Sequence, residues 1–226
     1  MSTFGARTVY CPACGAGTER TVVVSLNGGR RPDLRRQILD GTFQRVVCPG
    51  CGAPHRLEEP FVYIDFDRKQ WITCFPPARE AEWSSLESEP REDWKEAMIT
   101  YAPPLVRAWS AGFTVRAVFG LAALREKLVC IDQGVHDIWL AVMQLDAMLQ
   151  LPEVGFHASR RLRLVGVDGE LLIHRIPGTD TSLAVPRGRL VGMQADPLAW
   201  SAAYEALGKG PYVDVGRILL AGGAWR

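Results

Sequence analysis

The spacing of apolar and polar positions divides the chain into a strand-rich first third, a helical middle and a final part that returns to strands. Residues 21–26 form a β-branched run typical of a strand, and residues 43–47 predict another that leads into a cysteine pair. Residues 61–66, which alternate with a period of two, and residues 70–75 predict a hairpin. The first third is therefore expected to be built mainly from short strands.

A short helix is expected between these strands, at residues 32–40. Pro32 suits the first helical turn, and Leu34 and Ile38 share one face. Gly41 can end the helix in a left-handed conformation.

The middle of the chain is predicted to be mainly helical, and the end of the chain is predicted to return to strands. Helices are expected at residues 91–101, 121–129 and 135–149, and a strand at residues 113–119. Toward the end, the pattern predicts a hairpin of residues 161–167 and 170–175, a strand pair of residues 181–185 and 188–193, and a helix at residues 197–207.

Two Cys-Pro-x-Cys-Gly units carry the strongest chemical signal. The first contains Cys11 and Cys14, and the second contains Cys48 and Cys51. Two residues between paired cysteines let one tight turn aim both thiolates at one ion, and the following glycine permits a positive φ. Four thiolates with no open position predict a closed structural site for one Zn²⁺ ion per chain. Iron in a rubredoxin-like arrangement would use the same ligands and stays open.

Thiol redox chemistry is a second interpretation of the paired cysteines. Cys-Pro-x-Cys also resembles the glutaredoxin redox motif, but glycines after Cys14 and Cys51 oppose the helix that this motif requires. Redox chemistry is therefore the weaker alternative.

The remaining cysteines and the nearest histidine are expected to play no part in this site. Cys74 and Cys130 are expected to be small buried side chains, and His55 is expected to lie at the surface.

The predicted fold class is α+β. We expect a zinc-ribbon-like β domain with four cysteine ligands and a short inserted helix at residues 1–77, and a mixed helix and strand domain at residues 104–226. Between them, residues 78–103 are expected to form an acidic linker and a helix, because residues 79–96 contain seven acidic and three basic side chains, a net charge of −4.

Composition excludes several classes of protein. The 226 residues are 47% hydrophobic and 23% charged, with a formal net charge of +1, which is typical of a globular protein and gives no overall attraction to nucleic acid. The most apolar stretch, residues 113–149, is interrupted by charges such as Glu126 and Lys127, so no membrane span is expected. With no secretory signal visible, we expect a cytoplasmic protein.

Arginines give one part of the chain a local positive charge. Between residues 20 and 56 there are seven arginines and two acidic residues, a local net charge of +5. The four that cluster at the predicted helix, and so form a possible nucleic-acid contact, are Arg30, Arg31, Arg35 and Arg36. A second group, Arg160, Arg161 and Arg163, is expected at solvent-facing strand positions.

No catalytic motif is visible. Phosphate-binding loops, HExxH, dinucleotide fingerprints and GxSxG are all absent from the sequence. His136 and Asp137 are neighbours on a predicted helix and point in different directions, and His174 is expected on the outer face of a strand. We therefore expect no enzyme activity.

The chain resembles the bacterial CpXC domain, a family of largely uncharacterised proteins. The resemblance rests on the two Cys-Pro-x-Cys units and on residues 25–27, 38–41, 60–65, 116–121, 124–127, 132–134, 137 and 212–215. It implies metal ligation by the four paired cysteines and implies no catalytic residue.

By elimination, the sequence predicts a non-enzymatic interaction or scaffold protein that binds another protein and is stabilised by a structural zinc site of four cysteines. The first alternative is a nucleic-acid-binding or regulatory protein that uses the arginine cluster. The second is a thiol redox protein.

Overall fold

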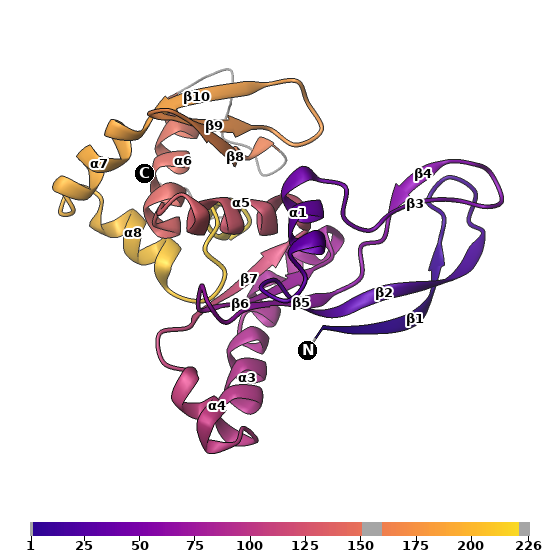
Figure 1. The fold of residues 1–226 in the computed structure, drawn as a ribbon. Helices are drawn as coiled ribbons and strands as arrows, with labels where there is room; N and C mark the ends of the chain where they lie inside the picture. The colour runs from indigo at the N-terminus through magenta and orange to yellow at the C-terminus, as the bar shows by residue number, and fades with distance from the viewer. Residues whose placement is uncertain (1, 151–159, 222–226) are drawn as a thin grey trace. The chain divides into compact units, whose positions relative to one another are not determined.

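A computed structural model describes residues 2–150 and 160–221, which divide into two compact units (Figure 1). Unit 1 comprises Met1–Glu80 and Glu89–Leu121, and unit 2 comprises Ala81–Ser88 and Ala122–Arg226. The mixture of helices and sheets confirms the predicted α+β class, and the N-terminal strands carry the cysteine cluster, consistent with a zinc-ribbon-like region.

A five-stranded mixed sheet in the order β1-β2-β5-β6-β7 forms the centre of unit 1. Its strands are β1 (Thr3–Tyr10), β2 (Gly17–Asn27), β5 (Phe61–Asp65), β6 (Gln70–Phe75) and β7 (Thr114–Phe119). β2 pairs in parallel with β5 and β6 with β7, while the other two pairs are antiparallel. Leu26, Tyr63 and Ile72 are fully buried, so the core of unit 1 lies over the central strands.

Local signals place the first helix where the sequence predicts it. α1 spans Pro32–Asp40 and buries Ile38. Gly41 adopts a φ of 73°, and its N–H group bonds to carbonyls of the last turn, which is the left-handed ending expected of glycine.

A second hairpin lies between α1 and β5. It consists of β3 (Arg45–Val47) and β4 (Pro54–Arg56). β3 is shorter than the predicted strand because Gln44 has a φ of 52°, and its side-chain oxygen accepts the N–H of Val23 at 3.0 Å. Neither β4 nor β1 is predicted from the hydrophobic pattern.

The acidic segment consists of several short helices. It contains η1 (Pro77–Glu82), α2 (Trp83–Leu86), α3 (Glu89–Lys95) and η2 (Glu96–Thr100), and α4 (Pro104–Trp109) follows. α3 packs against β6 and β7. The predicted division at residues 77 and 103 therefore differs from the packing, because β7 completes the sheet of unit 1 by pairing with β6.

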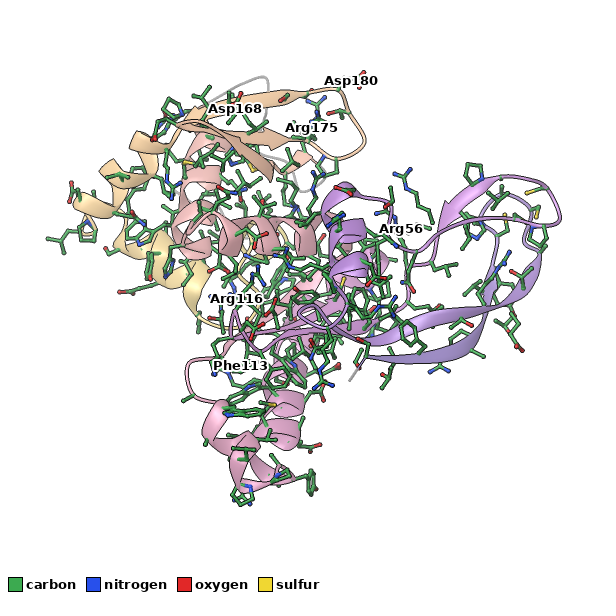
Figure 2. The ribbon with its side chains drawn as sticks, viewed as in Figure 1. Arg56, Phe113, Arg116, Asp168, Arg175 and Asp180 are labelled. Carbon is green, nitrogen blue, oxygen red and sulfur yellow. The ribbon has the colours of Figure 1, made fainter. Side chains whose placement is uncertain are left out.

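Unit 2 combines helices with a small antiparallel sheet. Its helices are α5 (Leu121–Asp132), α6 (Asp137–Gln150), α7 (Arg187–Ala195), α8 (Ser201–Gly208) and α9 (Gly216–Leu219), together with α2. The sheet order is β10-β9-β8, with β8 at Arg163–Asp168, β9 at Leu171–Arg175 and β10 at Ser182–Pro186. In Figure 2, Asp168 lies at one end of this sheet and Arg175 at the other.

One predicted strand of unit 2 is wrong. Residues 188–193 belong to α7, which begins after Pro186. Leu190 and Met193 are both buried, three residues apart on one helical face, and α7 packs against α6. Packing of Leu190 and Met193 against a neighbouring helix therefore makes this segment helical, which the sequence pattern did not predict.

Charged side chains occupy the interior of unit 2, contrary to expectation. A buried ion network consists of Glu126, Arg161, Arg163 and Asp214, and a further ion pair joins Lys127 to Asp137. Arg163 has only 6% of its surface exposed, so the predicted solvent-facing position is wrong. His174 is fully buried, and its predicted outward position is wrong too.

The carboxylates of Glu126 and Asp214 each have several donors. Glu126 accepts hydrogen bonds from Arg163 at 3.1 Å and from Gln144 and the Leu164 N–H group at 2.7 Å each. Asp214 accepts from Arg163, and from Arg161 at 2.9 Å. The network joins α5, α6 and β8 to the chain before α9, and each buried charge is neutralised by a partner from another element.

Candidate metal centre

The four paired cysteines lie at the turns of two hairpins in unit 1. Cys11 follows β1 and Cys14 precedes β2, while Cys48 follows β3 and Cys51 precedes β4. Each Cys-Pro-x-Cys unit therefore forms the tip of a hairpin, and the fold brings the two tips together.

The two turns repeat the same backbone hydrogen bonds. In the first, the Cys11 N–H bonds to the carbonyl of Ala16 at 3.0 Å, and the Gly15 N–H bonds to the carbonyl of Cys11 at 2.8 Å. In the second, the Cys48 N–H bonds to Ala53 at 3.0 Å, and the Gly52 N–H bonds to Cys48 at 2.9 Å. Gly15 and Gly52 have φ values of 72° and 73°. The positive φ expected after each cysteine pair is confirmed.

The spacing of the sulfurs fits a tetrahedral ion. All four Sγ atoms lie within 4.8 Å of one another. The Sγ atoms of Cys11 and Cys51 are 3.8 Å apart, and those of Cys14 and Cys48 are 3.7 Å apart. A tetrahedron with metal–sulfur bonds of about 2.3 Å requires sulfur–sulfur distances of about 3.8 Å. Two of the sulfur pairs therefore already have the required separation, and all four sulfurs lie close enough together to bind one metal ion.

The thiols of Cys48 and Cys51 differ in how readily they ionise. The N–H groups of Cys51 and Gly50 point at the Cys48 sulfur and lower the pKa of that thiol to about 6. The Ala53 N–H also favours ionised Cys51, but its sulfur neighbours outweigh it and raise the pKa of Cys51 to about 12. Four sulfurs this close therefore cannot all be thiolates unless a cation neutralises them.

A small apolar core supports the two hairpins. Val9, Val22 and Leu57 are buried together, with Val46 packed against them. Cys11 and Cys48 are buried, whereas Cys14 and Cys51 are exposed. This apolar cluster is small, so a metal ion bound to the sulfurs would contribute directly to folding.

Other candidate ligands stay outside the cluster. In the part of the chain that the structure describes, the group around these sulfurs contains only cysteines. His55 is half-buried in β4, with Nδ1 3.4 Å from the Ala53 carbonyl oxygen. Cys74 and Cys130 are buried elsewhere, as predicted, with 3% and 2% of their surfaces exposed.

Two of the four clustered arginines are bound within unit 1. Arg31 forms a two-pronged ion pair with Asp33, at 2.9 and 2.6 Å. Arg35 donates from Nε to the Tyr63 hydroxyl at 3.1 Å. Arg30 and Arg36 are exposed. The cluster therefore offers fewer free guanidinium groups to a phosphate backbone than the sequence suggests.

The sequence pattern did not reveal the buried ion network. A signal was present, since Glu126 and Lys127 interrupt an otherwise apolar helix. The same pattern is common on helices with one solvated edge, so it does not identify burial by itself.

Comparison with known proteins agrees with the cysteine geometry. A sequence model of the family described as CpXC protein matches residues 9–144, which include all four paired cysteines and well over half of the 226 residues. No curated protein and no solved structure matches the chain. Within residues 2–150 and 160–221, no helix has the length and apolar character to cross a bilayer. The chain belongs to the CpXC protein family.

Proposed function

We propose that this protein is a non-enzymatic interaction module in which a structural zinc ion holds an open strand edge ready for a protein partner. The observation that carries the proposal is β1, the eight-residue strand at one end of the five-stranded sheet. Among the described residues it pairs only with β2. Its outer edge therefore presents backbone donors and acceptors that a partner strand can use.

The side chains of β1 support this role. Natural edge strands are usually short or protected by charge, yet Arg7 is the only charged residue of β1. Phe4 and Tyr10, six residues apart on the same face, are 47% and 71% exposed. Exposed aromatic side chains beside an open edge favour contact with another protein.

The cysteine cluster would fix the end of this strand. Cys11 follows Tyr10 directly, so a metal ion on the cluster would hold the β1–β2 hairpin in one register. Zinc suits a closed site of four thiolates and adds no redox chemistry, and it is the metal that we propose.

A matched pair of variants tests the edge. The double variant Phe4→Lys, Tyr10→Lys is expected to capture at least tenfold less partner from nuclease-treated extract than wild-type protein does, because lysine opposes strand addition. Tyr101→Lys, which changes a 78% exposed tyrosine outside β1, is expected to capture as much as wild type. Capture is measured by quantitative mass spectrometry, with metal content as the check on folding.

Two results would contradict the proposal. Equal capture by wild-type and double-variant protein would show that the edge is not used. Binding that disappears with nuclease treatment and falls steeply with salt would favour the nucleic-acid alternative through the arginine cluster.

A further inference from the structure

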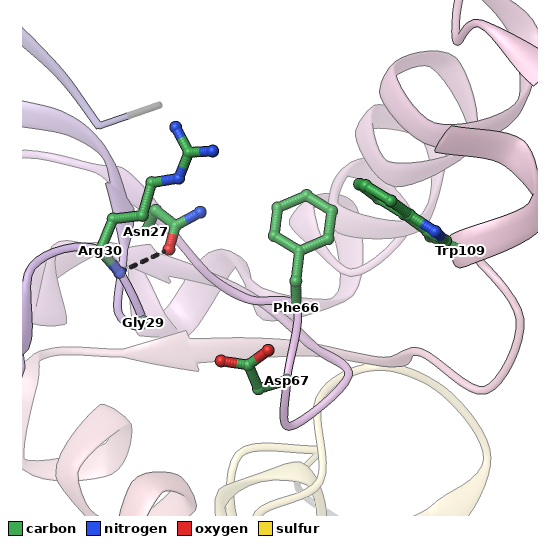
Figure 3. A pocket seen from close by; sticks show the side chains of 6 residues that line it. All are labelled: Asn27, Gly29, Arg30, Phe66, Asp67 and Trp109. Carbon is green, nitrogen blue, oxygen red and sulfur yellow. Dashed lines mark hydrogen bonds between the residues drawn. The ribbon is translucent and has the colours of Figure 1, made fainter. Parts of the chain in front are cut away.

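A half-open cavity of about 450 Å³ lies in unit 1, away from the cysteine cluster. Three segments line it: the end of β2 and the following loop with Asn27, Gly29 and Arg30, the β5–β6 turn with Phe66 and Asp67, and the end of α4 with Trp109 (Figure 3). Its volume falls within the range of small-molecule sites, about 300–1,000 Å³.

The loop after β2 is held in place by a local hydrogen bond and by one to β5. The Asn27 side-chain oxygen accepts the Arg30 N–H at 3.0 Å, and the Gly28 N–H bonds to the Ile64 carbonyl at 2.8 Å. A Cβ atom on Gly29 would lie 3.3 Å from Asp67 Oδ2, so the absence of a side chain there keeps the cavity open.

Aromatic rings form the opposite wall. The Phe66 ring meets the Trp109 ring edge to face, with centroids 6.5 Å apart, and meets Phe113 in the same way at 5.7 Å. Lys69 donates to the Trp109 carbonyl oxygen at 2.7 Å and so fixes the end of α4. Trp109 is nevertheless 49% exposed, which leaves an apolar surface for a ligand.

One positive and one negative side chain complete the lining. Neighbouring charges are engaged, since Arg31 pairs with Asp33 and Arg68 with Asp65. Among the described residues, neither the Arg30 guanidinium nor the Asp67 carboxylate has an ion-pair partner, and the two do not pair with each other. Figure 3 shows the Arg30 side chain and the Phe66 ring projecting to the same side, with the Asp67 carboxylate below them.

We propose that this cavity binds a small zwitterion with an apolar side chain, either a free α-amino acid or a dipeptide. The guanidinium of Arg30 would take the carboxylate, for which its fork of donors is suited. The Asp67 carboxylate would take the ammonium group, and the Phe66 and Trp109 rings the side chain. This inference goes beyond the interaction module and does not depend on the edge of β1.

Titration of each ligand into each variant tests each contact separately. The ligands for titration calorimetry are L-phenylalanine, the dipeptide Leu-Phe, N-acetyl-L-phenylalanine, which lacks the ammonium group, and L-phenylalanine amide, which lacks the carboxylate. Wild-type protein is expected to bind at least one of the two zwitterions at millimolar or lower concentration. The tighter of L-phenylalanine and Leu-Phe identifies the source of the zwitterion.

Each charge variant should affect only the ligands that carry the group its side chain binds. Arg30→Gln is expected to weaken binding of the zwitterion about tenfold and to leave binding of the amide unchanged. Asp67→Asn is expected to weaken binding of the zwitterion by a similar factor and to leave binding of the N-acetyl compound unchanged. Gly29→Val should block every ligand by filling the cavity. The matched controls Arg36→Gln and Asp40→Asn, both on α1 and outside the cavity lining, should bind like wild type.

Absence of binding of both zwitterions to wild-type protein would overturn the proposal. Binding that is equal in wild type, Arg30→Gln and Asp67→Asn would also overturn it, because the ligand would then lie elsewhere. Partner capture through β1 is measured in a separate experiment, so either proposal can fail while the other stands.

Discussion

Cys48→Ser is expected to abolish stoichiometric metal binding and to unfold the β1–β2 and β3–β4 hairpins. Cys48 is buried, its sulfur lies 3.7 Å from that of Cys14, and two backbone N–H groups stabilise its thiolate. Structural zinc sites contribute on the order of 10 kcal/mol of folding free energy, far more than a few buried valines supply. The measurements are elemental analysis of purified protein and hydrogen exchange of residues in both hairpins.

Cys74→Ala is the matched control for this experiment. Cys74 is also buried, with 3% of its surface exposed, but lies in β6 outside the cluster. The control should keep one metal ion per chain and lose only about 1 kcal/mol of stability from the missing sulfur. Retention of the metal by Cys48→Ser, or unchanged melting of wild type after treatment with a strong chelator, would refute the structural role of the site.

Asp214→Ala is expected to lower the free energy of unfolding of unit 2 by about 3–5 kcal/mol, because it leaves Arg163 and Arg161 buried without one of their acidic partners. Urea unfolding followed by circular dichroism measures the change. Asp180→Ala, which removes an exposed carboxylate, should change stability by less than about 0.5 kcal/mol. Equal stability of the two variants would show that the ion network does not stabilise unit 2.

The same carboxylate gives a dependence on pH. Burial opposes ionisation of Asp214, but Arg163 and Arg161 outweigh it and lower the pKa of this carboxyl below its usual range. A carboxyl whose pKa is lower in the folded than in the unfolded state stabilises the fold above the unfolded pKa of about 4. That contribution is lost as the pH falls through the folded pKa. The stability difference between wild type and Asp214→Asn should therefore be constant above about pH 5 and shrink below pH 4; a difference that does not change would contradict this origin.

Features that depend on neighbouring residues could be predicted from the amino-acid sequence alone. The two cysteine turns, with Gly15 and Gly52 at positive φ, follow from Cys-Pro-x-Cys-Gly alone. The bounds of α1 follow from Pro32 and Gly41, which act within one turn of the helix ends. The β5–β6 hairpin is likewise confirmed because alternation and a short turn are local signals.

Features whose stabilising partners are far away in the chain could not be predicted and are seen only in the folded protein. β1 has few buried side chains and is held by its pairing with β2, so its sequence gives no clear strand pattern. Arg163 meets Glu126 and Asp214 from 37 and 51 residues away, and a charge whose partner is so distant looks like a surface charge. The cavity with Arg30, Asp67 and Trp109 also draws on three separate segments. Local propensities act over a few residues, whereas burial and charge pairing depend on which segments the folded chain brings together.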